Sequence, residues 1–525
     1  MRFYVLPLSE STLENHKYAV YLPHDPQGLA YWLIPEQLLE PMTELPLTRL
    51  SDYETAIANP KVNQTFVSNP NLEAMLRGRR LLLDEVTAMF SLQEIHEHVC
   101  HGYIHYSAGI VPQSRKLACS RCGTSDPFLL AQIECARCND MCTYCRSCIL
   151  MGRVNSCTPF LTWHGTQQLN DTKMPRLGWQ GELSPAQKKA ADALVNEVNT
   201  PLTENRSFLT WAVCGAGKTE MLFPAILAGL EAKKPVLIAT PRTDVVLELL
   251  PRLRTAFPNT VVEGFYGGAD DRYAKAQLLI ATTHQLLRYH NYFPNVIIDE
   301  VDAFPFSYDE KLHFAVKKAS LSPSLTIYLT ATPPKELKSA AENGKIPHVK
   351  VPRRYHGHPL PVPKLMWIGN WMKNLQRKKK LPYHLLHWIK QTLERKKQVF
   401  LFLPRIDLQP AVVAALRHVF PEVSTDSVYA NDEERREKVM RYREGKIRIL
   451  VTTTILERGV TVKGVQVGVL GAEDRIFTES ALVQIAGRVG RSADEPTGDV
   501  IFFHHGKTTA MVEAIRHIEA MNQEK

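Results

Sequence analysis

The feature that most constrains this chain is a glycine-rich loop between a predicted strand and a predicted helix. Residues 213–219 read VCGAGKT, follow the apolar run FLTWAV and precede the helical pattern EMLFPAILAGLEA. Strand, glycine-rich loop, Lys-Thr and helix is the context that a phosphate-binding loop requires. Glycines let backbone N–H groups point at phosphates, and the dipole of the helix adds to the attraction. We therefore expect Lys218 to reach the β- and γ-phosphates of a nucleotide and Thr219 to hold Mg²⁺.

Apolar strand-like runs alternate with helical stretches from residue 181 onward, which predicts α/β domains with parallel sheets covered by helices. A Pro- and His-rich stretch at 351–363 separates two such units, placed here at 166–360 and 361–525. The expected strands are 208–213, 235–240, 278–282, 296–299, 325–330, 398–404, 427–429, 448–453, 465–470 and 499–503. Residues 508–523 are expected to form an amphipathic helix.

The first 165 residues have a different texture. Residues 1–100 carry no chemical motif and are treated as an accessory region, in which 33–47 and 71–92 are predicted to be partly helical. Residues 101–165 form a Cys-rich module that is too small to bury much apolar core. A bound metal would have to supply its stability.

Seven of the ten cysteines fall between Cys119 and Cys148, and paired CxxC spacings of this kind predict a zinc site. Two CxxC knuckles complete a tetrahedral S₄ site that is structural, not catalytic. One such set is Cys119, Cys122, Cys145 and Cys148. Cys135 and Cys138 have an equally suitable spacing for replacing part of that set. With Cys142 and Cys157, they could instead hold a second zinc.

Acids follow a strand in the first α/β unit. Residues 296–302 read VIIDEVD and lie about 80 residues after the phosphate-binding loop. Carboxylates at the carboxyl end of a parallel strand face the ligand crevice. We expect Asp299 to hold Mg²⁺ and Glu300 to orient or deprotonate the attacking water.

Two arginines stand out in the second unit, where residues 484–491 read QIAGRVGR. Arg488 and Arg491 are three residues apart and would share one face of a helix. Arg is the residue that stabilises charge on a transferring phosphoryl group. Because these arginines lie in a different predicted domain from the loop, they can act on one phosphate only if the domains close over it.

The net charge is +9, and most of this excess lies in one segment. Residues 371–398 hold nine Lys or Arg and one acid, including RKKK at 377–380. A helix there would put Leu385, Trp388 and Ile389 inward, with Lys390 and Lys397 outside. Aromatic residues among cations suit single-stranded nucleic acid, and a solvated helix face is an equally good interpretation.

The composition is that of an ordinary globular protein, with 44% hydrophobic and 22% charged residues, which excludes a disordered or fibrous chain. No stretch approaches 18 consecutive apolar residues, and the N-terminus lacks a signal peptide's apolar core, so a cytoplasmic location is expected.

These motifs, in this order, resemble those of superfamily 2 helicases and translocases. Residues 212–219 match the helicase form of the loop, AxxGxGKT, and 299–302 read DEVD, a variant of the DEAD box. Residues 329–332 match the motif that couples nucleotide state to strand binding, 452–459 match the fifth motif and 484–491 the sixth. The resemblance implies two tandem RecA-like domains and a DNA-stimulated ATPase. Arg242, Thr283, Thr453 and Thr454 are the candidates for contacts with DNA phosphates, which fix position without reading sequence.

A narrower set of segments resembles the ComFA family of DNA-uptake ATPases. It comprises CxRC…YCRSC, TTHQLLR (282–288), DEVDAFP (299–305), PRRYHG (352–357), ILERGVT (455–461), QIAGRVGRS (484–492) and PTGD (496–499). The resemblance implies an ATP-driven motor for single-stranded transforming DNA at the inner face of the cell membrane. Its implied partners are a ComEC-type channel, a ComFC-type protein and DNA-processing proteins.

The resemblance also assigns residues. It implies a nucleotide site of Gly215, Ala216, Gly217, Lys218, Thr219 and Glu220, catalysis by Lys218, Asp299, Glu300, Arg488 and Arg491, and zinc on Cys119, Cys122, Cys145 and Cys148. Gln187, ahead of the loop, matches an adenine-reading position, although an ordinary polar helix residue is an equally good interpretation.

Two other functions compete with DNA uptake. A PriA-like replication-restart or repair helicase shares the motor, but its zinc cysteines lie within the motor's second half, whereas here they precede the loop. A zinc module fused to a degenerate NTPase is disfavoured, because Lys218, Glu300 and Arg491 are all present.

Overall fold

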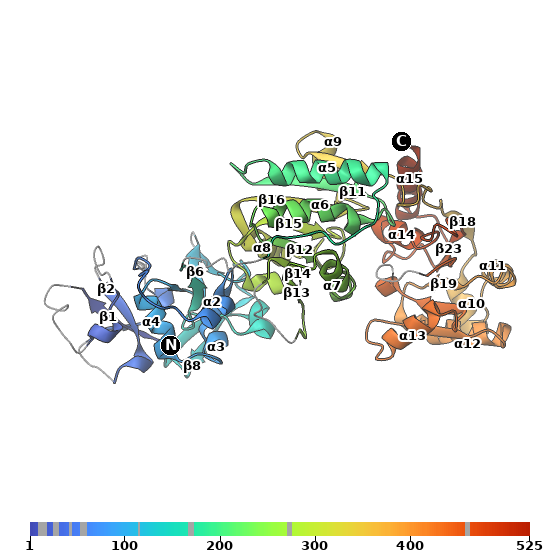
Figure 1. The fold of residues 1–525 in the computed structure, drawn as a ribbon. Coiled ribbons are helices and arrows are strands. Elements are labelled where there is room, and N and C mark those ends of the chain that lie inside the picture. The colour runs from blue at the N-terminus through green and yellow to red at the C-terminus, as the bar shows by residue number, and fades with distance from the viewer. Residues whose placement is uncertain are drawn as a thin grey trace.

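The computed structural model describes residues 1–8, 18–24, 31–40, 45–52, 60–113, 116–165, 173–269, 276–456 and 462–524. An N-terminal unit, a seven-stranded sheet domain and a six-stranded sheet domain lie in a row (Figure 1). Within the described ranges, no helix has both the length and the apolar character needed to cross a membrane.

All seven strands of the first sheet are parallel, in the order β13-β14-β12-β15-β16-β11-β17. Five of them fall where the sequence predicts strands: β11 (Arg206–Ala212), β12 (Val236–Thr240), β14 (Leu278–Thr282), β15 (Phe293–Asp299) and β16 (Ser320–Thr330). The other two, β13 (Val262–Phe265) and β17 (His348–Val351), are edge strands that the sequence did not reveal. An edge strand lacks the continuous apolar run of a strand covered on every side.

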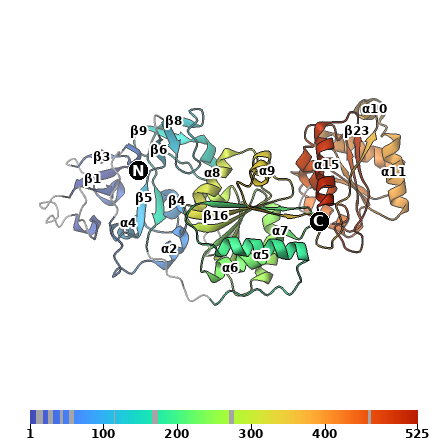
Figure 2. The same cartoon turned by 90° about the horizontal axis from the view of Figure 1, so that it is seen from above.

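Helices cover both faces of this sheet. Figure 2 shows β16 nearly edge-on, with α5 (Pro185–Asn199), α6 (Lys218–Glu231) and α7 (Thr243–Ala256) on one side and α8 (Glu310–Ala319) and α9 (Lys335–Glu342) on the other. Alternation along β12 divides its side chains, because Val236 and Ile238 join the core under α6 whereas Leu237 and Ala239 join the core under α8.

The second sheet is also wholly parallel, in the order β18-β23-β22-β19-β21-β20. Its strands are β18 (Lys364–Trp367), β19 (Val399–Phe402), β20 (Thr425–Val428), β21 (Ile449–Thr452), β22 (Gln466–Leu470) and β23 (Val500–His504). Its helices are α10 (Trp371–Lys378), α11 (Tyr383–Glu394), α12 (Gln409–Val419), α13 (Arg435–Arg443), α14 (Glu479–Ala486) and α15 (Thr509–Gln523). The predicted α/β class with two tandem parallel sheets is confirmed.

The N-terminal unit is built from short antiparallel sheets. Its strands are β1 (Phe3–Pro7), β2 (Tyr31–Pro35), β3 (Leu47–Thr48), β4 (Arg80–Leu82), β5 (Ile104–Ser107), β6 (Ile110–Gln113), β7 (Lys116–Cys119), β8 (Leu130–Cys135), β9 (Asp140–Cys145) and β10 (Phe160–Trp163). Its helices are α2 (Pro70–Leu76), α3 (Leu83–Val86) and α4 (Leu92–Cys100). Within 33–47 the described helical structure is one short 3-10 helix, Glu36–Leu38, whereas the residues before it belong to β2, which pairs with β1 and buries Trp32, Leu33 and Ile34 together. Three consecutive buried residues suit a strand covered on both faces.

One hydrophobic core contains residues from both sides of position 100, where the sequence predicts a boundary. Strand β10 pairs with both β4 and β5, and Leu72, Leu81, Ile104 and Leu161 pack in the same cluster. Residues before and after position 100 therefore fold together, and the N-terminal unit is described below as one body.

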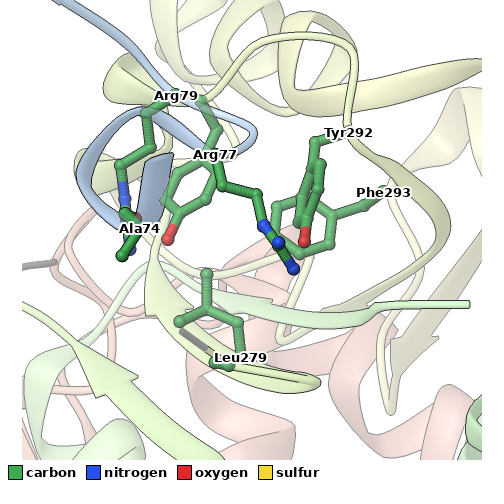
Figure 3. A pocket seen from close by; sticks show the side chains of 8 residues that line it. Ala74, Arg77, Arg79, Leu279, Tyr292 and Phe293 are labelled. Carbon is green, nitrogen blue, oxygen red and sulfur yellow. The ribbon is translucent and has the colours of Figure 1, made fainter. Parts of the chain in front are cut away.

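The N-terminal unit is fixed to the first sheet domain. Figure 3 shows the side chain of Arg77, which follows α2, beside the ring of Tyr292 and near Phe293 at the start of β15, whereas Arg79 points toward Ala74. Gly78 has φ +66°, and a Cβ there would lie 2.3 Å from the Tyr292 ring, so this ring packs against the backbone of Gly78 only because Gly78 lacks a side chain.

Ionic contacts reinforce the same seam. Glu85 accepts hydrogen bonds from Arg121 Nη2 at 2.7 Å and from Arg288 Nε of the sheet domain at 3.0 Å. Lys318 Nζ on α8 donates to the carbonyls of Arg121 at 2.8 Å and Leu287 at 2.7 Å. Burial, together with Arg80 and Arg121, lowers the pKa of Lys318 to about 7.

Candidate functional site

The phosphate-binding loop lies between the end of β11 at Ala212 and the start of α6 at Lys218. Gly215 has φ +82° and Gly217 has φ +69°, conformations that a residue with a Cβ rarely adopts. A Cβ at Gly217 would also lie 2.3 Å from Gln187 Nε2. Gly215 and Gly217 are therefore required by the shape of the loop, while Ala216 between them is fully buried.

Gln187 contacts the loop directly. It occupies the first turn of α5, where Ser184 N donates to its Oε1 at 2.8 Å as part of a capping box. Its Nε2 donates to the carbonyl of Ala216 at 2.8 Å. The buried amide of Gln187 thus holds the loop against the helix that precedes β11.

Lys218, Thr219 and Glu220 form the first turn of α6 and are all half-buried. Their position places a cation, a hydroxyl and a carboxylate at a helix N-terminus, the end that attracts phosphate. Glu220 forms an ion pair with Arg252 of α7. The loop residues thus have the conformation and chemistry of an anion site.

The acids follow β15, a central strand of the first sheet. Asp299 is its last residue, and Glu300 follows in a left-handed conformation with φ +59°, its N–H donating to Leu329 O at 3.0 Å. Both are half-buried. The turn brings their carboxylates to the carboxyl edge of the sheet, where the phosphate-binding loop also lies.

Asp302, the last acid of the motif, connects both sheet domains. Its carboxylate accepts hydrogen bonds from Thr330 Oγ1 at 2.6 Å and Thr332 Oγ1 at 2.7 Å, both at the end of β16. Ser480 Oγ, on α14 of the second sheet domain, donates to the same carboxylate at 2.6 Å. Sequence reasoning had singled out residues 329–332 but neither Asp302 as their partner nor Ser480.

The two arginines lie in a turn, and the expectation that they share a helix face is wrong. Helix α14 ends at Ala486, because Gly487 caps it and Gly490, with φ +69°, turns the chain. Arg488 is 2% exposed, and Arg491 Nε donates to the carbonyl of Gly487 at 3.0 Å.

Arg488 is buried among charged groups of both domains. Burial and the nearby Arg491 lower its pKa, while Cys214 and Glu300 act in the opposite direction. The influence of Glu300 indicates that Arg488 of the second sheet domain lies near the acid motif of the first.

The two sheet domains are in direct contact beside the phosphate-binding loop. Cys214 Sγ donates to Gln484 Oε1 of α14 at 2.9 Å. A Cβ at Gly487 would lie 2.4 Å from Cys214 Cβ, so the backbone after α14 rests directly on the loop. These contacts bring together the segments 212–219 and 484–491, which are about 270 residues apart.

The segment 352–357 contributes residues that sequence reasoning left without a role. Arg354 is 1% exposed and donates from Nη1 to the carbonyl of Gly490. Tyr355 N donates to Gly215 O at 3.0 Å, and His356 Nε2 lies 3.1 Å from Gly490 O. Burial, aided by Arg491, lowers the pKa of Arg354 to about 10. The sequence signal was the segment PRRYHG itself, which resembles the ComFA family but does not indicate what its arginines contact.

The residues expected to contact nucleic acid have mixed environments. Arg242 pairs with Asp244 and donates from Nη2 to Ile455 O of the second domain at 2.9 Å. Thr283 is fully buried, whereas Thr453 and Thr454 are half-buried after β21. The rest of the fifth motif, residues 457–459, lies outside the described residues, as do 460 and 461 of the ILERGVT segment.

The basic segment forms an open surface beside β18. Residues 377–380 are exposed at the end of α10, and Leu385, Trp388 and Ile389 of α11 point inward. Lys390 is exposed as expected, whereas Lys397 is half-buried in an ion pair with Glu495 at 2.6 Å. A cavity of about 370 Å³ is lined by Lys378 and Lys380 together with Trp367 and Tyr383, whose rings are 65% and 72% exposed.

The cysteines form two separate groups. Cys119, Cys122, Cys145 and Cys148 are buried together, with Sγ–Sγ distances of 3.9 Å for Cys119–Cys148 and 3.6 Å for Cys122–Cys145. Cys135, Cys138, Cys142 and Cys157 form the other group, so Cys135 and Cys138 do not replace members of the first. The first group packs with α8 in a shared core. Each group offers four thiols that could hold a metal.

Known proteins match the chain along most of its length. Three family models match it in succession: the competence protein ComFA N-terminal domain at 63–162, the type III restriction enzyme, res subunit, at 180–335, and the helicase conserved C-terminal domain at 378–493. The first match begins well before residue 100, where sequence reasoning had found nothing of the family.

Two curated relatives are similar over most of their own length. Competence protein ComFA of Bacillus subtilis is 46% identical over 465 residues, covering 89% of this chain and 98% of that protein. Competence protein ComFA of Streptococcus pneumoniae is 37% identical over 403 residues, covering 75% and 91%. Replication restart protein PriA of Rickettsia felis is 26% identical over 246 residues, covering 44% and 37%.

One solved structure adds a fold comparison alone. The DEAD-box helicase Mss116 bound to ssRNA and UDP-BeF covers 65% of this chain and 78% of its own, with a TM-score of 0.48 and 15% identity.

The tandem parallel sheets and the matched ATPase domains define a superfamily 2 helicase-like ATPase. The identity to the curated competence proteins is more specific. The chain belongs to the ComFA family of competence proteins.

Proposed function

We propose that this chain is an ATP-dependent motor that moves single-stranded transforming DNA inward during natural competence. The observation that carries the proposal is the direct contact of the phosphate-binding loop with the segment 484–491 of the second sheet domain, where Cys214 Sγ donates to Gln484 Oε1 at 2.9 Å and the backbone at Gly487 rests on Cys214. A nucleotide site that is completed by two domains forms when they approach and opens when they separate. A motor needs such a link between hydrolysis and domain movement.

The roles at the nucleotide site follow from position. Lys218 neutralises the β- and γ-phosphates, while the N–H groups of Gly215, Ala216 and Gly217 surround them. Thr219 and Asp299 would hold Mg²⁺, which supplies charge neutralisation when bound. Glu300 orients the attacking water, and Arg488 and Arg491 stabilise charge on the transferring phosphoryl group.

Two further residues support the site. Gln187 holds the loop through Ala216 O and is proposed to read the adenine ring, and Glu220 stabilises the first turn of α6 through Arg252. Arg354 donates to Gly490 O of the sixth motif, while the next residue, Tyr355, donates from its N–H to Gly215 O of the loop. Arg354 is therefore proposed as a positioning residue. We propose the limits 166–360 and 361–525 for the two motor domains.

Coupling between hydrolysis and movement runs through Asp302. Its bonds to Thr330, Thr332 and Ser480 connect the acid motif to the residues 329–332 and to α14. A shift of Glu300 after hydrolysis moves Asp302, two residues away, and so alters the contact with the second domain. This network offers a physical route from the γ-phosphate to domain position.

The strand is held by both domains. Exposed rings of Trp367 and Tyr383 beside Lys378 and Lys380 provide stacking and charge together, which suits single-stranded DNA of any sequence. Thr453 and Thr454 are available for phosphates at the end of β21, and Arg242 is available once its contact with Ile455 opens.

The first cysteine group is proposed to hold a structural zinc. Its four buried thiols leave no open position, so the metal stabilises the fold of the N-terminal unit and does no chemistry. The partners are proposed by family membership: a ComEC-type channel at the inner face of the cell membrane, a ComFC-type protein and DNA-processing proteins.

ATPase rate against single-stranded DNA, duplex DNA and RNA tests the proposal. We expect single-stranded DNA to stimulate hydrolysis most, with salt-dependent binding that is indifferent to sequence. Unwinding of forked duplexes without stimulation by plain single strands would instead support the PriA-like alternative. A rate unaffected by any nucleic acid would contradict both motor functions, and a competence defect in a deletion strain tests the biological assignment.

A further inference from the structure

The hairpin β8–β9 connects both cysteine groups. Cys142 and Cys145 lie three residues apart on β9, so their side chains point to opposite faces of the strand. Cys145 joins the first group at one end of the hairpin, while Cys142 joins Cys135 and Cys138 at the turn. The turn itself is a knuckle in which Cys138 N donates to Cys135 O at 3.2 Å.

The four sulfurs of the second group have the spacing of a tetrahedral zinc site. All lie within 4.8 Å of one another, with Cys135–Cys157 at 3.7 Å and Cys138–Cys142 at 3.2 Å. Zn–S bonds of about 2.3 Å place the sulfurs of a tetrahedron about 3.8 Å apart. All four cysteines are free thiols, and Cys138, Cys142 and Cys157 are each 1% exposed.

The apolar cluster at the hairpin turn consists of these cysteines alone. Cys138, Cys142 and Cys157 form its buried part, and Cys135 packs against them. Strand β8, in contrast, has no fully buried residue. A hairpin with so little core needs another source of stability to hold four thiols together, and a bound metal is the usual one in small modules.

Two arginines lie beside the second group, where their positive charge would offset the excess negative charge of a tetrathiolate. Arg49 Nη1 lies 3.9 Å from Cys142 Sγ and also contacts Met141 O. Arg137 Nη1 donates to Thr158 Oγ1 at 3.1 Å, next to Cys157. The acids beside them, Asp52 and Asp140 with Arg49, and Asp84 with Arg137, are each paired with one of these arginines and not with the thiols.

We propose that Cys135, Cys138, Cys142 and Cys157 hold a second zinc ion, independent of the ion in the first group. With four sulfur ligands and no open position, it is a structural site. Because Cys157 precedes β10 while the other three ligands lie at the turn of the hairpin, this zinc fixes the hairpin to the segment that leads into β10. Arg49, which follows β3, contacts Cys142 at the same place. Ser51 Oγ, which donates to Ser156 O at 2.5 Å, marks the same junction.

The test is the zinc content of the purified full chain, measured by mass spectrometry after removal of loosely bound metal. The parent is compared with Cys138→Ser and Cys157→Ser in the second group and with Cys145→Ser in the first. Cys100→Ser is the matched control, since Cys100 is a buried thiol on α4 that belongs to neither group.

We expect two zinc ions per chain in the parent and in Cys100→Ser, one in each of the other single variants, and none in Cys138→Ser combined with Cys145→Ser. One zinc in the parent, two in Cys138→Ser, or loss of both ions from Cys138→Ser with unchanged circular dichroism would overturn the proposal. If the variants do not fold, the cobalt-substituted parent decides. A thiolate-to-cobalt absorption band of eight Co–S bonds per chain supports two sites, and a band of four overturns them.

Discussion

At the residue scale, the most informative side chain is Asp302, because one carboxylate accepts hydrogen bonds from hydroxyls of both sheet domains. Asp302→Asn replaces one acceptor oxygen by a donor, which cannot accept from Thr332 and Ser480. Hydrogen bonds to a charged group contribute about 1.5–3 kcal/mol each. We expect DNA stimulation of the ATPase to fall about tenfold or more, with nucleotide affinity unchanged. Steady-state hydrolysis with and without single-stranded DNA measures it.

Ser480→Ala is the milder companion, since it removes only the contact from the second domain. It should reduce stimulation less than Asp302→Asn does. Equal stimulation in both variants and the parent would show that the network does not couple the domains.

Substitutions at Lys218 and Glu300 should distinguish ATP binding from ATP hydrolysis. Lys218→Ala should abolish hydrolysis, because Lys218 is the loop's only cation for the β- and γ-phosphates. Glu300→Gln should keep ATP binding and lose turnover, since the amide cannot orient or deprotonate water. Nucleotide affinity by fluorescence and hydrolysis by phosphate release measure the two effects. Hydrolysis by Glu300→Gln at the parent rate would refute the assignment of the acid motif.

At the element scale, the segment 352–357 offers an internal comparison between adjacent arginines. Arg354 is buried and donates to Gly490 O, whereas Arg353 is half-buried and donates from Nη2 to Asn522 O on α15 at 2.9 Å. Arg354→Ala should lower kcat about tenfold or more, because it releases the sixth motif from the loop side. Arg353→Ala should change kcat little. A larger loss of kcat in Arg353→Ala than in Arg354→Ala would contradict this prediction, because it would make the contact with α15 the more important one for catalysis.

The basic run at 377–380 belongs to the same scale. Replacing its four residues by Ala should weaken single-stranded DNA binding while leaving basal ATPase unchanged, because the run lies away from the loop. Each lost phosphate contact should reduce the slope of log affinity against log salt by about 0.7. Lys188→Ala with Lys189→Ala, two exposed lysines on α5, is the control. Unchanged affinity in the fourfold variant would mean that the run is only a solvated surface.

Elements with strong local signals could be predicted from the sequence. The central strands have continuous apolar runs, and the loop 213–219 has its own signature, so both were located without a structure. The sequence does not reveal the edge strands β13, β17 and β18. They are short or alternate between apolar and polar residues, and each pairs with only one neighbouring strand. The arginine turn was mistaken for a helix, because spacing alone does not reveal that Gly487 and Gly490 end α14.

The candidate site was predictable by parts and not as an assembly. Lys218, Asp299 and Glu300 stand in recognisable motifs. The roles of Arg354, in the segment 352–357, and of Ser480 could not be assigned, because they come from partners more than a hundred residues away in sequence. The two cysteine groups likewise required the hairpin register, which assigns Cys142 and Cys145 to different sites.

At the scale of the whole molecule, Glu85 determines how firmly the N-terminal unit is held. It lies between Arg121, which is fully buried, and Arg288 of the first sheet domain. Glu85→Gln leaves both guanidinium groups without a carboxylate, and breaking a buried pair costs about 3–5 kcal/mol. We expect a lower Tm for the first thermal transition by calorimetry. Glu97→Gln, an exposed acid on α4, should leave Tm unchanged, and equal values for both variants would contradict the role of Glu85.

The shared core of the first cysteine group and α8 has a mechanical consequence. It makes the N-terminal unit a rigid extension of the first sheet domain, on the side away from the second (Figures 1 and 2). If the second sheet domain rotates against the first about the contact of Cys214 with Gly487, the N-terminal unit would move as one body with the first sheet domain. A small rotation at this contact would become a larger displacement at the far end of the N-terminal unit, so a partner bound there would move farther than the residues at the nucleotide site.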